Sequence, residues 1–116
     1  MGRELPLVFA CSGSCREGEL TDRIARRLMR ADVAEMCSLA ALHGNISKAC
    51  RAAMAKKIIV IDGCHLGCAA AALEELGYTD LQHLDLCEWD ELIGDRSVCE
   101  STIKKVVRKA AAMLQQ

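Results

Sequence analysis

The chain has 116 residues, enough for one domain with a single core, and 52% of them are hydrophobic while only 3% are aromatic. Fifteen lysines and arginines stand against sixteen aspartates and glutamates, a formal net charge of -1 that excludes bulk electrostatic binding of nucleic acid. No apolar run approaches the roughly 18 residues that cross a membrane, and the first run lacks the basic flank and cleavage site of a signal peptide. We therefore expect a cytoplasmic protein of one domain, residues 1–116.

The first third of the chain predicts a strand, a loop and a helix. The apolar run LPLVFA at residues 5–10 is typical of a strand, and the small residues of CSGSCREG at 11–18 predict a tight loop. A helix is expected over about 19–30, where apolar residues recur every three to four positions and four arginines lie away from that stripe. We interpret these arginines as a solvated face. The next segment, 35–41, is ambiguous between a short strand that carries Cys37 and a link between helices.

The middle of the chain contains the clearest strand signal. A helix is expected over residues 47–57, and Cys50 falls on its apolar stripe, so we interpret that cysteine as part of the core. The run IIVI at 58–61 is uninterrupted, the pattern of a strand buried on both faces of a parallel sheet. The DG dipeptide that follows ends the run with turn chemistry. A helical pattern then extends to Gly77, a typical residue after a helix C-terminus.

The last third completes an alternation of strands and helices. The alternating run LQHLDL at residues 81–86 predicts a strand with His83 on its polar face. Ser97 and Glu100 form a capping box that predicts the start of a final helix, whose apolar stripe extends to Leu114. This order predicts a single α/β domain. We expect a three-layer α/β/α sandwich with a mostly parallel sheet of about four strands, similar to Rossmann and flavodoxin folds.

Cysteine is the unusual component of the composition. The eight cysteines are Cys11, Cys15, Cys37, Cys50, Cys64, Cys68, Cys87 and Cys99. Disulfides are rare in the cytoplasm, so clustered cysteines there indicate metal binding or redox chemistry. The chain has no CxxC knuckle of the zinc-ribbon type, but it has two CxxxC pairs, at residues 11–15 and 64–68.

The predicted topology brings cysteines from separate segments together. Parallel strands end at one edge of a sheet, where open α/β proteins bind ligands. Cys11 and Cys64 both follow predicted strands, Cys68 lies one helical turn further on, and Cys37 joins them if 35–41 is a parallel strand. Four thiolates suit a tetrahedral zinc site, although they leave a formal charge of minus two for loop amides to offset. Helix N-termini favour thiolates, which serves metal binding and redox chemistry equally.

These residues resemble the DGC domain family, small microbial proteins named for a central Asp-Gly-Cys motif. Residues 62–64 match that motif, and the resemblance extends to ACSG at 10–13, MCSLAALHGNI at 36–46 and IDGCHLGCA at 61–69. It covers nearly the whole domain. The resemblance implies zinc binding by four cysteines and no established reaction. By motif these ligands map onto Cys11, Cys37, Cys64 and Cys68.

Three interpretations stay open at this point. The first is a zinc-binding protein with a structural, sensory or metal-delivery role. The second is a thiol redox enzyme or electron carrier that uses the same cysteines, one form of which holds an iron–sulfur cluster. The third is an interaction domain whose cysteines only pack. Cys15, His65 and Cys87 are further candidates for the site, Asp62 is interpreted as a turn-shaping acceptor for the following amides, and His83 as a surface residue.

Overall fold

The structure is a computed structural model. It describes residues 5–11, 16–37, 57–63, 66–78, 80–88 and 98–115. Residues 47–56 of the helix expected over 47–57, with Cys50, lie outside the described residues, as do Cys15, Cys64 and His65.

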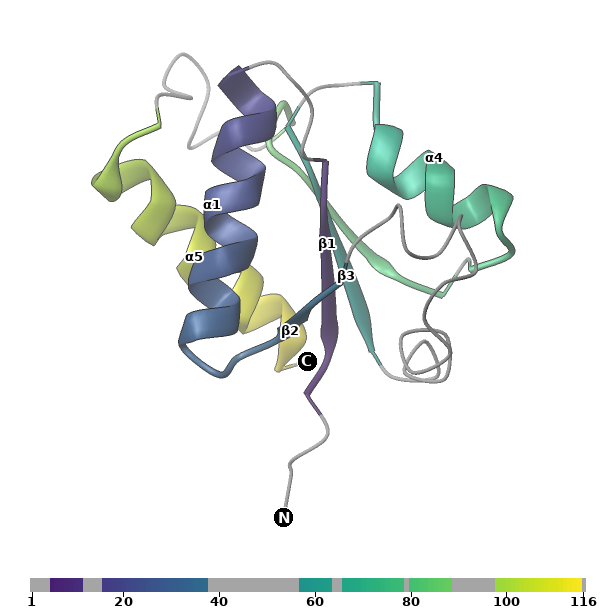
Figure 1. The fold of residues 1–116 in the computed structure, drawn as a ribbon, viewed down its shortest axis with the longest axis horizontal. Helices are drawn as coiled ribbons and strands as arrows, with labels where there is room; N and C mark the ends of the chain where they lie inside the picture. Colours follow the sequence, from purple (N-terminus) through teal and green to yellow (C-terminus); the bar gives the residue numbers. More distant parts are fainter. Residues whose placement is uncertain are drawn as a thin grey trace.

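A four-stranded parallel sheet forms the middle layer of the described structure, in the order β2-β1-β3-β4 (Figure 1). Its two central strands are β1 (Leu7–Ala10) and β3 (Ile58–Asp62), which pair directly with each other. Every residue of both strands is buried, which is why their sequences are continuous apolar runs rather than alternating ones. The predicted α/β class with a parallel sheet is confirmed.

The two outer strands are shorter. β2 (Glu35–Met36) pairs in parallel with β1, so the ambiguous segment does contain a strand, and Cys37 follows it directly. β4 (Gln82–Asp85) pairs in parallel with β3 on the other side of the sheet. This order is that of the flavodoxin-like sheets, in which the order of the strands reverses between β1 and β3.

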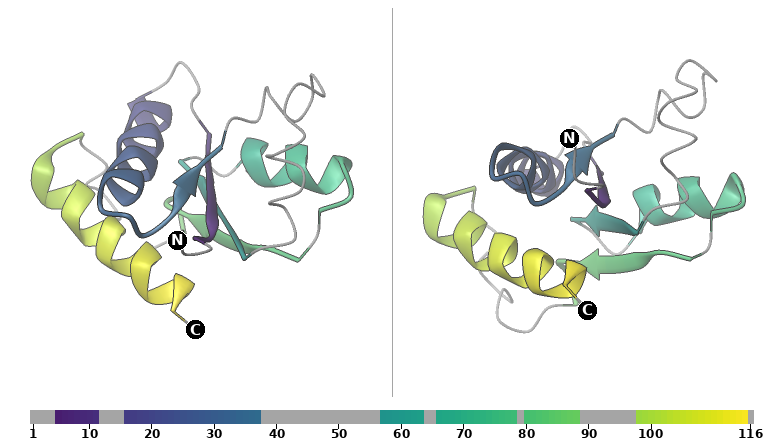
Figure 2. Two further views of the ribbon diagram at one scale, coloured as in Figure 1. Left: turned by 60° about the horizontal axis from the view of Figure 1, so that its bottom comes forward. Right: turned by 90° about the horizontal axis from the view of Figure 1, so that it is seen from below.

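Helices cover both faces of the sheet (Figure 2). α1 (Arg16–Arg30) and α5 (Glu100–Leu114) lie on one face, and α4 (Cys68–Glu75) lies on the other. Alternate residues of each central strand therefore enter different cores. Val8 and Ile59 pack with α1 and α5, whereas Phe9 and Val60 pack with α4. No helix in the described ranges is long and apolar enough to cross a bilayer.

The last helix begins two residues later than the predicted capping box requires. α5 starts at Glu100 with Cys99 as its N-cap, and the Cys99 side chain makes no capping hydrogen bond. Ser97 lies outside the described residues. Both Glu100 carboxylate oxygens instead accept hydrogen bonds from the guanidinium of Arg27 on α1, at 2.7 and 2.9 Å. The Glu100 side chain, which the local motif predicts to cap the helix, therefore forms an ion pair with a residue of another helix.

Candidate functional site

Two of the four predicted ligands lie at the carboxyl edge of the sheet. Cys11 follows β1 and Cys37 follows β2, and their backbone N–H groups continue the ladder by donating to Ile61 O (3.0 Å) and Val8 O (3.1 Å). Both side chains are half-buried and pack against the same hydrophobic cluster, the one on the α4 side. The fold thus places two cysteines that are 26 positions apart in the sequence after neighbouring strands and against one hydrophobic cluster.

The other two predicted ligands belong to the connection between β3 and α4. Cys68 is the first residue of α4 and is exposed, at the end of the helix that starts from this edge. Cys64 lies outside the described residues. Within the described part of the chain, no three His, Cys, Asp or Glu side chains form a group that could hold a metal ion. Ligation by the four cysteines therefore stays a prediction.

Asp62, the first residue of the DGC motif, is a buried carboxyl group at this edge of the sheet. Its side chain is 0% exposed at the end of β3. Oδ1 accepts a hydrogen bond from Ala69 N at 2.9 Å and Oδ2 accepts one from Ala70 N at 3.2 Å. The interpretation of Asp62 as an acceptor for the following amides is confirmed. The carboxylate caps α4 from the neighbouring strand, because the N-cap residue Gly67 has no side chain to do so.

Asp62 has a third partner that the sequence did not indicate. His83 Nε2 lies 2.6 Å from Asp62 Oδ2. The β3–β4 register pairs Val60 with His83, which places the imidazole on the α4 side of the sheet. The ring is 34% exposed, so the prediction of a surface residue is correct for its solvent contact and misses its bond. The two residues are 21 positions apart, and no local spacing relates them.

This pairing changes the electrostatics expected at the edge. From the sequence, loop amides are expected to offset the charge of four thiolates; the amides of Ala69 and Ala70, at the start of α4, already donate to a carboxylate. A carboxylate at a helix N-terminus is itself favourable. Asp62 therefore occupies amides that a thiolate at this helix start would otherwise accept from, and His83 is its further partner, on the solvent side of the carboxylate.

Gly63, the second residue of the motif, allows a close contact between the turn and α1. A Cβ placed on Gly63 would lie 2.6 Å from Glu17 O and 2.7 Å from Glu17 Cβ. Any side chain would therefore collide with the first turn of α1. The next turn of α1 contacts the end of β1, because the Thr21 hydroxyl lies 2.7 Å from Cys11 O and 2.9 Å from Gly18 O.

Cys87 lies beside the same turn. Its Sγ is 3.7 Å from Gly63 O, and its backbone N–H donates to Asp85 Oδ1 at 2.9 Å. Leu86 N donates to Asp62 O at 2.9 Å, so the chain after β4 follows the backbone of the motif. The structure thus brings Cys87, one of the open candidates, to the carboxyl edge. Cys99 is instead the N-cap of α5, the helix that lies with α1 on the face of the sheet away from α4.

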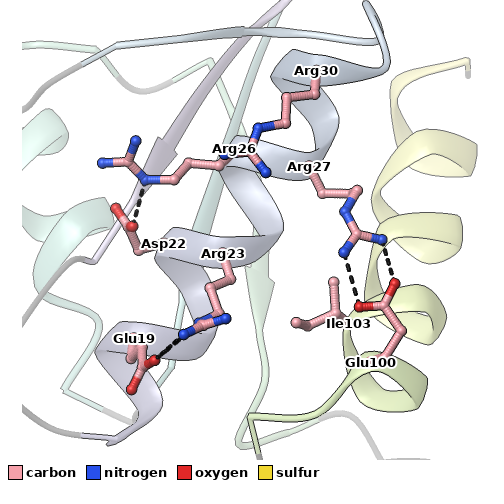
Figure 3. A pocket seen from close by; sticks show the side chains of 8 residues that line it. All are labelled: Glu19, Asp22, Arg23, Arg26, Arg27, Arg30, Glu100 and Ile103. Atoms are coloured by element: carbon pink, nitrogen blue, oxygen red, sulfur yellow. Dashed lines mark hydrogen bonds and ion pairs between the residues drawn. The ribbon is translucent and has the colours of Figure 1, made fainter.

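A pocket of about 370 Å³ lies away from these cysteines, between α1 and α5 (Figure 3). Six of its seven charged residues pair with one another, Arg23 with Glu19, Arg26 with Asp22 and Arg27 with Glu100, and Arg30 is the seventh. The hydrogen bond from Arg27 lowers the pKa of Glu100. These exposed, internally balanced pairs agree with the interpretation of the arginines as a solvated face.

Comparison with known proteins identifies relatives at the level of the family. The family model described as DGC domain matches residues 7–110. A curated protein of Pseudomonas aeruginosa, "Anaerobic and virulence modulator AnvM", is 38% identical over 85 residues. The match covers 72% of this chain and 65% of that protein, slightly less than two thirds of the relative's length. No solved structure gives a significant match.

Proposed function

Since this chain belongs to the DGC domain family, we propose that it binds a zinc ion at the carboxyl edge of its sheet. The proposed ligands are Cys11, Cys37, Cys64 and Cys68. The strand order is the observation that carries the proposal. β2, β1 and β3 are neighbours in the sheet, and each is followed within two residues by one of the first three cysteines. The switch between β1 and β3 is also where sheets of this order bind ligands.

The chemistry of the donors supports zinc in particular. Thiolates are soft ligands that zinc accepts in tetrahedral structural sites. Cys11 and Cys37 are half-buried and Cys68 is exposed, so the proposed site lies at the boundary between the core and solvent. The described residues supply three of the thiols without a complete metal-binding group, and the proposal therefore depends on Cys64.

The proposed role is structural, sensory or metal delivery. A zinc ion with four protein ligands has no open position for a substrate, which argues against hydrolysis at the metal. The proposal places the protein in the cytoplasm, where thiols stay reduced and available to a metal ion.

Metal analysis of Cys64→Ser tests the proposal. The full chain, purified without added metal, should contain about one zinc per molecule, because a closed structural site binds one ion. Cys64→Ser should lower both the zinc content and the melting temperature, since binding at a structural site contributes folding free energy. Cys99→Ser is the matched control: it removes an exposed thiol at the start of α5 and should leave zinc unchanged. Full zinc and unchanged melting in Cys64→Ser would contradict the proposal.

A thiol redox enzyme or electron carrier is the second candidate. The position of Cys87 favours it, because a fifth thiol beside the DGC turn exceeds the four that zinc requires. Visible absorbance in the iron–sulfur bands of the purified protein would identify a cluster. Reversible loss of two titratable thiols on mild oxidation of metal-free protein would identify a redox pair.

A further inference from the structure

One carboxylate connects three segments of the chain. Asp62 ends β3, Ala69 and Ala70 belong to the first turn of α4, and His83 belongs to β4. The Ala69 and Ala70 amides donate hydrogen bonds to the Asp62 side chain, and His83 Nε2 is hydrogen-bonded to Asp62 Oδ2. When Asp62 is ionised its carboxylate only accepts hydrogen bonds, and His83 is then the donor through Nε2–H. With its side chain 0% exposed, Asp62 depends on these partners, because a buried charge without them is costly.

Few interactions within α4 itself determine the residue at which the helix begins. It spans eight residues, and isolated helices of that length are marginal in water. Its N-cap Gly67 adopts a left-handed conformation with φ 60 and makes no side-chain cap. The direction of its first turn, which carries Cys68, therefore depends on the carboxylate that receives its amides.

His83 closes this arrangement from the solvent side. A Cβ on Gly67 would lie 3.9 Å from His83 Cε1 and 3.9 Å from Asp62 Oδ2, so the imidazole lies against the residue that immediately precedes Cys68. The ring is the solvent-facing partner of Asp62, because its side chain is 34% exposed while Ala69 and Ala70 are buried. The 2.6 Å between His83 Nε2 and Asp62 Oδ2 is short for a hydrogen bond between nitrogen and oxygen.

We propose that His83 and Asp62 are a positioning pair that holds the first turn of α4, and with it Cys68, in the geometry that metal binding requires. This inference rests on the proposed function. Neither residue is a ligand in it. The pair acts as the outer shell of hydrogen bonds that orients ligands in metal sites, where loss of such a partner typically lowers metal affinity 10- to 100-fold.

The first part of the test uses the metal-free full chain. Hydrogen exchange at the Ala69 and Ala70 amides reports the hold of Asp62 on the helix start directly. His83→Ala should accelerate exchange at both amides by at least about tenfold, because a hydrogen bond to a charged group is lost. His83→Gln keeps an N–H donor and should restore most of the protection. Asp80→Asn, an exposed carboxylate change three residues before His83, is the control and should exchange at the wild-type rate.

The second part is a Co²⁺ titration of the same variants, followed by displacement with Zn²⁺. His83→Ala should bind Co²⁺ about 10- to 100-fold more weakly and with altered thiolate charge-transfer bands, while His83→Gln recovers most of the affinity and the spectrum. Wild-type Co²⁺ affinity and spectrum in His83→Ala would overturn the positioning role, whatever its exchange rates. If the wild-type chain itself binds neither Co²⁺ nor Zn²⁺, the proposed function is wrong, and the inference that rests on it is overturned as well.

Discussion

Gly63→Ala is the sharpest test of how the DGC turn is packed. The added Cβ would lie 2.6 Å from Glu17 O and 2.8 Å from Glu17 C, both backbone atoms of α1. Optimal contacts between such atoms are about 3.5–4.0 Å, so the turn and the helix must separate by roughly 1 Å. A helix backbone cannot rotate aside as a flexible side chain can. The variant therefore strains the contact between the motif and α1 itself.

The expected cost follows from measured overpacking in protein cores. Inserted methylene groups cost about 1–3 kcal/mol, and the upper end applies here because the colliding atoms are backbone. About 3 kcal/mol is a large part of the total stability of roughly 5–15 kcal/mol. At about 4 °C per kcal/mol for a chain of this length, the melting temperature should fall by roughly 12 °C.

Thermal and urea unfolding followed by circular dichroism measure this loss. Gly77→Ala is the matched control: its Cβ would meet no described atom within 4 Å, although φ there is +97. Left-handed strain alone should cost it about 1–2 kcal/mol. If Gly63→Ala melts like the wild type, or costs less than Gly77→Ala, the close packing of the turn against α1 is not what requires a glycine.

Two further predictions concern charged residues. Asp62→Asn should lower the free energy of unfolding by about 2–3 kcal/mol, because the amide NH₂ replaces one acceptor oxygen beside two buried backbone donors and His83. Asp80→Asn should change it by less than about 0.5 kcal/mol, and equal effects in urea melts would contradict this. Arg27 lowers the pKa of Glu100, mainly through their hydrogen bond, so its stabilisation is present at neutral pH and is lost as pH falls through the lowered pKa. Glu100→Gln should therefore melt below the wild type at pH 7 and low salt. The difference should begin to shrink as pH falls below the ordinary glutamate pKa of about 4.3 and should disappear once pH is below the lowered pKa of Glu100; a gap that does not shrink with acid would refute the pair.

The places where sequence prediction succeeded share a physical reason. β1 and β3 were predicted because both faces of each strand are buried, which leaves an apolar run that no exposed segment would keep. Gly77 was predicted to end α4, and it does follow the last turn with φ +97, where glycine is favoured. These signals are local: each can be read within about a dozen neighbouring residues.

The capping box failed because a local motif competes with partners from elsewhere in the chain. Glu100 had the right spacing from Ser97, but the helix begins at Glu100 itself and its side chain pairs with Arg27, 73 positions away. The bond between His83 and Asp62 escaped prediction for the same reason. In the sequence of β4, polar and apolar residues alternate and His83 is at a polar position. Only the parallel register with β3 places it beside a buried carboxylate.

By itself the sequence determined the layers, the two central strands and the family, because burial on both faces and a contiguous motif leave marks in neighbouring positions. Tertiary structure alone decided what the motif's residues touch. It placed Cys37 beside β1, packed Gly63 against α1, brought Cys87 to the turn and gave Asp62 its histidine. Those contacts join segments far apart in the chain, and strand order and register, which no single segment encodes, set the distances between them.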